Sequence, residues 1–138
     1  MSPGNLAALY AICVVVFFML DLVWLATATP RLYRPRLGDL LDPKPKLGVA
    51  GIFYLAYVVG VVALAVVPGL DQGSVVVALW HGALFGFLAY ATYDLTNLAT
   101  IRNWPWQVSV VDMAWGTALN SLVAVAGYYA GVWLGMSA

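Results

Sequence analysis

The sequence has little charge: only 9% of its 138 residues are Asp, Glu, Lys or Arg, whereas roughly a quarter are charged in soluble domains. It contains no glutamate, so all six acidic residues are aspartates. With 64% hydrophobic residues, this composition excludes a soluble globular domain and indicates an integral membrane protein. The net charge is zero, without the excess of basic residues that is typical of nucleic-acid-binding proteins, so we expect no nucleic-acid partner.

Residues that carry redox, haem or Schiff-base chemistry are also scarce. The single cysteine, Cys13, excludes an internal disulfide and a thiolate metal cluster. The single histidine, His81, excludes a bis-histidine haem within one chain. Both lysines, Lys44 and Lys46, fall in a polar stretch, so no intramembrane lysine is available for a retinal-type Schiff base. No cofactor is evident from the sequence, and a bound divalent cation is the one cofactor that the sequence does not exclude.

Four apolar segments are each long enough to cross the roughly 30 Å hydrocarbon core of a bilayer as a helix. The sequence therefore predicts an all-α fold, a polytopic membrane protein built as a four-transmembrane-helix bundle. We expect a single domain over residues 1–138, with helices at about 6–28, 49–67, 75–98 and 108–134.

Every Lys and Arg lies in one of two connecting stretches, a loop predicted for residues 31–48 and a short loop at Arg102. The prolines of the first stretch are expected to prevent a long helix there. Because cytoplasmic loops carry an excess of Lys and Arg, we expect both loops in the cytoplasm and both termini on the outer side. The chain would then be a multi-pass protein of the cell inner membrane, with its basic loop against anionic lipids.

Three aspartates interrupt the apolar segments: Asp21, Asp94 and Asp112. With a rise of ~1.5 Å per helical residue, all three fall at a similar depth in the cytoplasmic half of the bilayer. Glycines at four-residue spacing, such as Gly86 and Gly116, let helices approach closely, so Asp94 and Asp112 are expected to face protein. We predict one ligand-binding site, in which the aspartates are joined by Asn97, Thr96, Tyr54, Tyr90, Trp24, Trp115 and Asn120.

The chemistry of such a site follows from the cost of an ionised aspartate in a bilayer, which is several kcal/mol unless it is paired, hydrated or protonated. Neighbouring carboxylates suit a proton or cation relay, a site for a cationic ligand, or a divalent metal held by oxygen atoms. The structural alternative is that the aspartates only stabilise helix ends. In that case Arg31 or Arg102 would reach back to neutralise them.

Two blocks of sequence are distinctive: residues 93–100, Tyr-Asp-Leu-Thr-Asn-Leu-Ala-Thr, and residues 112–116, Asp-Met-Ala-Trp-Gly. Together with the stretches at 21–25, 53–54 and 82–86, they resemble an uncharacterised bacterial membrane family, the domain of unknown function twenty-one seventy-seven. The resemblance covers nearly the whole chain. It implies a short inner-membrane protein of four helices and carries no established activity.

Our first hypothesis is that a cytoplasm-side, aspartate-lined site binds, and in a stronger form transports, a cation or a proton-coupled small molecule. A single four-helix chain makes a thin wall for a pore, so transport predicts a homo-oligomer. One alternative is a membrane enzyme that acts on a lipid or isoprenoid through a metal or an acid–base aspartate cluster. No serine–base pair or nucleophilic cysteine constellation supports an enzyme. The other alternative is a non-catalytic accessory subunit.

Overall fold

The structure is a computed structural model that describes residues 1–137, and these residues form helices joined by short connections. Four of the helical segments are long and apolar enough to cross a membrane, which confirms the predicted four-helix all-α architecture. The elements are α1 (Pro3–Ala28), the π-helix η1 (Thr29–Tyr33), α2 (Arg34–Leu37), the 3-10 turn η2 (Gly38–Leu40), α3 (Leu47–Val61), the π-helix η3 (Val62–Val66), α4 (Val67–Asp71), α5 (Val75–Thr100) and α6 (Trp106–Trp133).

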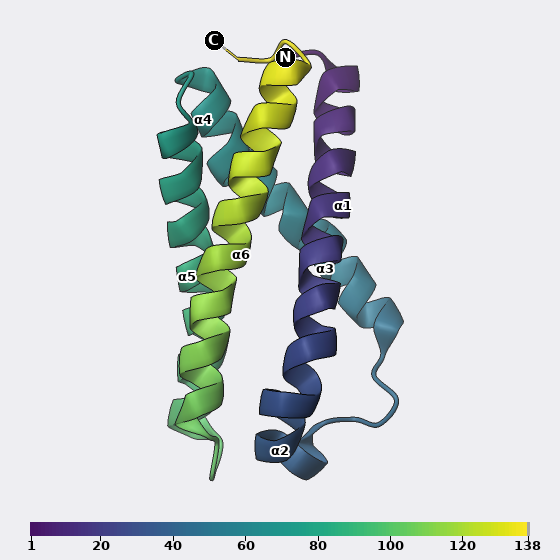
Figure 1. The fold of residues 1–138 in the computed structure, drawn as a ribbon, viewed down its shortest axis with the longest axis vertical. Coiled ribbons are helices and arrows are strands. Elements are labelled where there is room, and N and C mark those ends of the chain that lie inside the picture. The colour runs from purple at the N-terminus through teal and green to yellow at the C-terminus, as the bar shows by residue number, and fades with distance from the viewer. Residues whose placement is uncertain (138) are drawn as a thin grey trace.

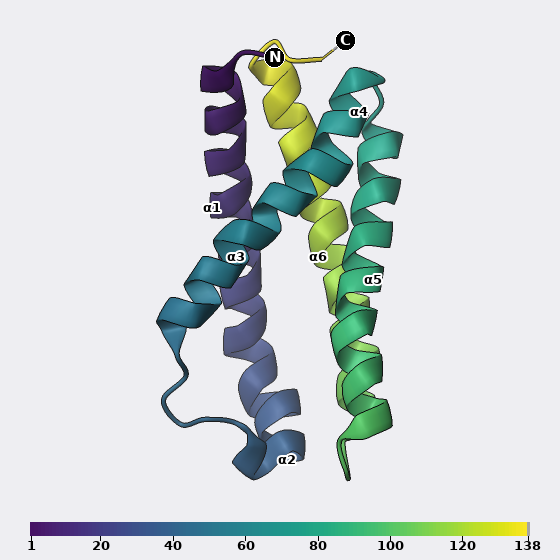
Figure 2. The ribbon, with the colours of Figure 1, turned by 180° about the vertical axis from the view of Figure 1, so that it is seen from behind.

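The helices do not pack as four parallel rods. α1, α5 and α6 run along the long axis of the molecule, with α5 and α6 side by side (Figure 1). α3 instead crosses the bundle obliquely, from the side of α1 at one end to the side of α5 at the other, where α4 begins (Figure 2). This crossing separates α3 from α5 in one half of the bundle, which is where the cavity described below lies.

The predicted loop at residues 31–48 was wrong over its first part, because the helix that begins at Pro3 continues to Leu40. Pro30 and Pro35 lie at the starts of η1 and α2, where the continuous helix passes from α to π geometry and back. Irregularities of a long helix commonly coincide with prolines and π-helical turns. The backbone changes direction at Gly38, which adopts a positive φ of 53°. Within the predicted loop, residues 41–46 are the part that lacks helical structure.

The core holds the helices together at the end of the bundle that carries the termini. It contains fully buried side chains from α1, α3, η3 and α6, including Leu9, Val58, Val66, Leu119 and Val123. The two cavities described below lie toward the other end of the bundle.

Between α5 and α6 the backbones approach each other at glycines, as the four-residue spacing predicts. A Cβ atom on Gly86 would lie 2.3 Å from the carbonyl oxygen of Gly116. A Cβ atom on Gly116 would lie 2.1 Å from Cγ of Tyr90. The close approach buries Asp94 completely and turns both Asp94 and Asp112 toward protein.

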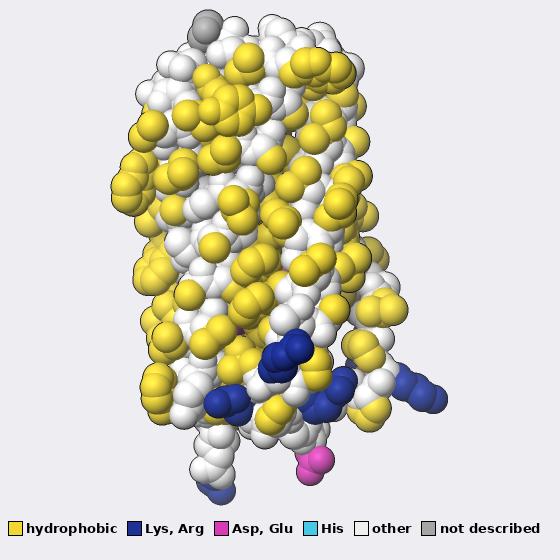
Figure 3. Space-filling view, viewed as in Figure 1, with side chains coloured by type: hydrophobic (Ala, Val, Ile, Leu, Met, Phe, Trp, Pro, Cys, Tyr) yellow, Lys and Arg dark blue, Asp and Glu magenta, His cyan; other side chains and the backbone are white. Residues whose placement is uncertain are grey.

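Charge is concentrated at one end of the bundle. Lys and Arg side chains gather at the end opposite to the two termini, and hydrophobic side chains cover the sides of the molecule in this view (Figure 3). Large apolar residues such as Ile52 and Trp133 are 73% and 81% exposed, as expected where side chains face lipid. The chain is therefore a multi-pass membrane protein whose termini share the end away from the basic residues.

Candidate functional site

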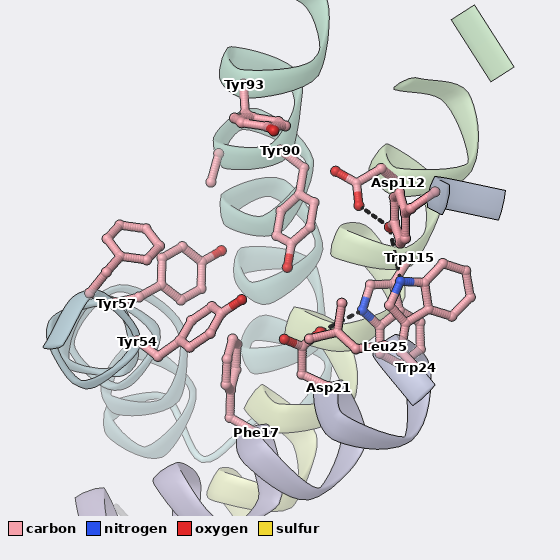
Figure 4. A pocket seen from close by; sticks show the side chains of 13 residues that line it. Phe17, Asp21, Trp24, Leu25, Tyr54, Tyr57, Tyr90, Tyr93, Asp112 and Trp115 are labelled. Carbon is pink, nitrogen blue, oxygen red and sulfur yellow. Dashed lines mark hydrogen bonds between the residues drawn. The ribbon is translucent and has the colours of Figure 1, made fainter. Parts of the chain in front are cut away.

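A cavity of about 360 Å³ lies among the four membrane-spanning segments, in the half of the bundle nearer the basic end. Its walls are mainly aromatic: five tyrosines, two tryptophans and two phenylalanines line it (Figure 4). Two carboxyl groups, those of Asp21 and Asp112, complete the polar part of the lining. We refer to this space as the aromatic cavity.

Asp21 enters the aromatic cavity from α1. Its side chain is only 5% exposed. Its carboxylate accepts a hydrogen bond of 3.1 Å from the indole N–H of Trp115 in α6. This bond joins α1 to α6 at the cavity wall, where Tyr54 of α3 is a further lining residue.

Asp112 reaches the same cavity from α6 and is held by a second chain of hydrogen bonds. The hydroxyl group of Tyr33 donates to Oδ1 of Asp112 over 2.5 Å, and the indole N–H of Trp24 donates to the Tyr33 oxygen over 3.0 Å. Trp24 also stacks on Trp115, with ring centroids 4.7 Å apart and planes within 6°. The stacked tryptophans therefore link the two aspartates.

The position of Tyr33 depends on the π-helix η1, which extends the first membrane segment past Ala28. π-Helical turns are rare and frequently occur at functional sites. Here the turn carries the Tyr33 hydroxyl group to Asp112 in α6. A predicted loop at this position gave no reason to place Tyr33 inside the bundle.

Replacing Tyr33 with phenylalanine is expected to lower the free energy of unfolding by about 1–3 kcal/mol, because it leaves Asp112 and the Trp24 N–H without their shared partner. Reversible unfolding in mixed micelles, followed by tryptophan fluorescence, would measure the change. Tyr129→Phe is the matched control, because Tyr129 is 58% exposed. Equal effects of the two substitutions would show that the Tyr33 hydroxyl contributes nothing.

Asp94 lies behind Asp112 and does not line the cavity. It is fully buried, and neither carboxylate oxygen accepts a hydrogen bond from an N–H or O–H group. Of the two aspartates Asp94 and Asp112, only Asp112 faces the cavity.

The short connection between α5 and α6 fixes the register of these two helices. The hydroxyl group of Ser109 donates to the backbone carbonyl oxygen of Asp94 over 2.7 Å. The indole N–H of Trp104 donates to the same Ser109 oxygen over 3.0 Å, and both side chains are buried. These contacts bind the last turns of α5 to the first turns of α6.

Six of the ten predicted site residues line the aromatic cavity: Asp21, Trp24, Tyr54, Tyr90, Asp112 and Trp115. The other four do not. Asp94 is behind Asp112, Thr96 is exposed and Asn97 is half-buried outside the lining. Asn120 is buried between α5 and α6, where its amide donates to the carbonyl oxygen of Gly116 over 2.7 Å and its own oxygen accepts no hydrogen bond.

Several lining residues were not predicted, among them Tyr33, Tyr57 and Tyr93. Tyr57 follows Tyr54 by three residues in α3, and Tyr93 follows Tyr90 by three residues in α5. Residues at this spacing lie on the same face of a helix, so helical periodicity was a signal for both of them. For Tyr33 the sequence carried no comparable signal.

None of the described side chains that line the aromatic cavity is a Lys or Arg. Arg31, which could have neutralised an aspartate, donates instead to the carbonyl oxygen of Thr27 over 3.0 Å. Arg102 is exposed in the connection between α5 and α6. The carboxyl groups of Asp21 and Asp112 thus face the cavity without a cationic side chain in its walls.

Comparison with known proteins gives one match, a family model described as "Predicted membrane protein (DUF2177)", which covers residues 6–129. No curated protein and no solved structure matches the chain.

Proposed function

The chain belongs to this family of predicted membrane proteins, DUF2177, and from the lining of its aromatic cavity we propose that it binds a small organic cation, such as an ammonium compound. The observation that carries the proposal is the combination of two carboxyl groups without a basic partner and walls made of aromatic rings. The cation would lie between Asp21 and Asp112.

Aromatic rings favour a cation because their faces carry partial negative charge, and the attraction reaches about 2 kcal/mol or more where water is excluded. Quaternary ammonium groups are recognised in this way by cages of aromatic residues. Carboxylates add a charge interaction that is much stronger inside a protein than in water. Both features occur together in this cavity, with Trp24 and Trp115 stacked beside the two aspartates.

The size of the cavity also fits a small molecule, because ligand sites in proteins commonly measure about 300–1,000 Å³. A hard metal ion fits less well. Among residues 1–137 there is no group of three or more His, Cys, Asp or Glu side chains that could hold one, whereas Ca²⁺ takes about 6–8 oxygen ligands. We therefore favour an organic cation over the divalent metal that the sequence left open.

The basic end of the bundle would face the cytoplasm of an inner membrane, with anionic lipids around its Lys and Arg side chains. The aromatic cavity would then open in the cytoplasmic half of the bilayer. In the stronger form of the proposal, a homo-oligomer transports the cation and couples its movement to a proton. Transport would require the helices to rearrange, because the packed core of Val58, Leu119 and their neighbours fills the bundle on the side of the termini.

The test compares two ligands of equal shape. Choline and 3,3-dimethylbutanol differ only in the charged nitrogen, which is carbon in the alcohol. We expect choline to bind protein in lipid nanodiscs saturably, at least about tenfold more tightly than the alcohol, because one charge interaction of about 1.4 kcal/mol already gives that ratio. Isothermal titration calorimetry and quenching of tryptophan fluorescence would measure both. Equal binding of the two compounds, or none, would contradict the proposal.

A further inference from the structure

A second, larger cavity of about 930 Å³ adjoins the aromatic cavity. Its lining residues come from α1, η1, α2, η2, the segment after η2 and the first half of α3. Figure 2 shows α2 and the start of α3 toward the end of the bundle opposite the termini. Asp21, Leu25 and Tyr54 line both spaces, so these side chains form the boundary between them. We call the second space the α1–α3 groove.

The lining of the α1–α3 groove is mainly apolar. Phe18 and Leu22 contribute from α1, and Leu47 and Ala50 from α3. Gly51 lies in the same wall, and a Cβ atom built on it would meet no atom within 4 Å. The α3 side of the groove is therefore unfilled next to the residues that bound the aromatic cavity.

We propose that the ligand is an alkylammonium amphiphile, whose cationic head occupies the aromatic cavity and whose apolar chain passes Leu25 and Tyr54 into the α1–α3 groove. The inference rests on the proposed cation site and adds the class of ligand. Asp21 lines both spaces, so its carboxylate would contact the cationic head at the point where the apolar chain leaves it.

The charged and the apolar parts of the groove lining come from different elements. Arg34, Asp39 and Asp42 belong to α2, η2 and the segment after η2, whereas the apolar side chains belong mainly to α1 and α3. An apolar chain that leaves the aromatic cavity past Leu25 and Tyr54 would follow the walls formed by α1 and α3. In the direction of the termini, the space beyond the aromatic cavity is filled by core residues such as Val58 and Leu119. The groove is therefore the space that borders the cation site and can take an apolar chain.

The experiment uses full-length protein in lipid nanodiscs and a series of alkyltrimethylammonium ions with ethyl, butyl, hexyl and octyl chains. Each added methylene that enters an apolar groove is expected to tighten binding about two- to fourfold. Gly51→Phe fills the groove and should remove this gain while the affinity for the ethyl compound stays within about twofold. Gly48→Phe is the matched control: it lies in the same helix, also has open space at Cβ, and lines neither cavity.

The comparison of the two variants removes the effect of ligand partitioning into lipid, which is the same for both. Gly51→Leu serves as a second groove-filling variant if the phenylalanine variant does not fold. The inference fails if chain length has no effect on wild type, or if both glycine variants respond to chain length as wild type does. In either case binding of the ethyl compound would leave the cation site itself standing. If no member of the series binds, the proposed function fails as well.

Discussion

Replacing Gly86 with alanine is expected to lower the free energy of unfolding by about 2–3 kcal/mol or more, as overpacking a tight interface does. The added Cβ atom would lie 2.3 Å from the carbonyl oxygen of Gly116 and 2.6 Å from the amide nitrogen of Asn120. One of these neighbours is backbone, so a side-chain rotation does not relieve the contact. α5 and α6 have to separate, and the hydrogen bonds around Asn120 and Asp94 would be strained with them.

The expected destabilisation by Gly86→Ala is opposite in sign to the usual effect of this substitution. Glycine to alanine in the interior of a helix usually stabilises it, by roughly 0.5–1 kcal/mol. Gly51→Ala is therefore the matched control, because its Cβ meets no atom within 4 Å and the substitution should stabilise slightly or have no effect. Unfolding in mixed micelles of dodecylmaltoside and sodium dodecyl sulfate would compare the two. A stabilising effect of Gly86→Ala would show that the close approach of α5 and α6 is wrong.

The parts of the structure that the sequence predicted depend on local signals. Hydropathy over about 20 residues is enough to find a membrane-spanning helix, and the four helices end within a few residues of their predicted bounds except after Ala28. Asp21 and Asp112 were found because a carboxylate in an apolar segment requires a partner or a function. Glycines at four-residue spacing indicated where α5 and α6 would meet.

The parts that the sequence did not predict depend on how the helices are arranged. Thr96 follows Asp94 by two residues, about 200° around a helix of 3.6 residues per turn, and so faces away from it. Asp94 is fully buried and does not line the cavity. The depth of a residue along one helix does not determine the direction in which its side chain points. The oblique path of α3 and the continuation of the first helix past Pro30 both came from tertiary packing, and they brought Tyr57 and Tyr33 to the site.

Asparagine at position 21 or 112 is expected to weaken choline binding about 100-fold, a loss of about 2.7 kcal/mol. At an effective dielectric constant of about 20, two unit charges 4 Å apart attract by about 4 kcal/mol, so loss of one carboxylate is large even after partial compensation. Asparagine keeps an oxygen acceptor for the hydrogen bonds of Asp21 with Trp115 and of Asp112 with Tyr33. The geometry of the cavity should therefore survive the change in charge.

Two further aspartates separate direct contact from general electrostatics. Asp94→Asn removes an acidic group that is fully buried behind Asp112, and because it does not line the cavity we expect a much smaller loss of choline affinity. Asp71→Asn changes an exposed aspartate at the end of α4 and should leave affinity unchanged. Titration calorimetry of the four variants would give this order. Equal losses at positions 21, 94 and 112 would instead indicate a long-range effect of charge and no specific cation site.

The ligand-free stability of the same variants bears on why the aspartates are present. A carboxylate kept in a membrane for binding lowers the stability of the empty protein, so its neutral replacement is expected to keep or raise the unfolding midpoint. A carboxylate that only joins helices would give the opposite result, a lower midpoint for each variant and no dependence on choline. Asp21 and Asp112 line a cavity without Lys or Arg in its walls. That environment favours the first outcome. Ligand-free wild-type protein would then have a lower unfolding midpoint than the asparagine variants, and bound choline would raise the wild-type midpoint.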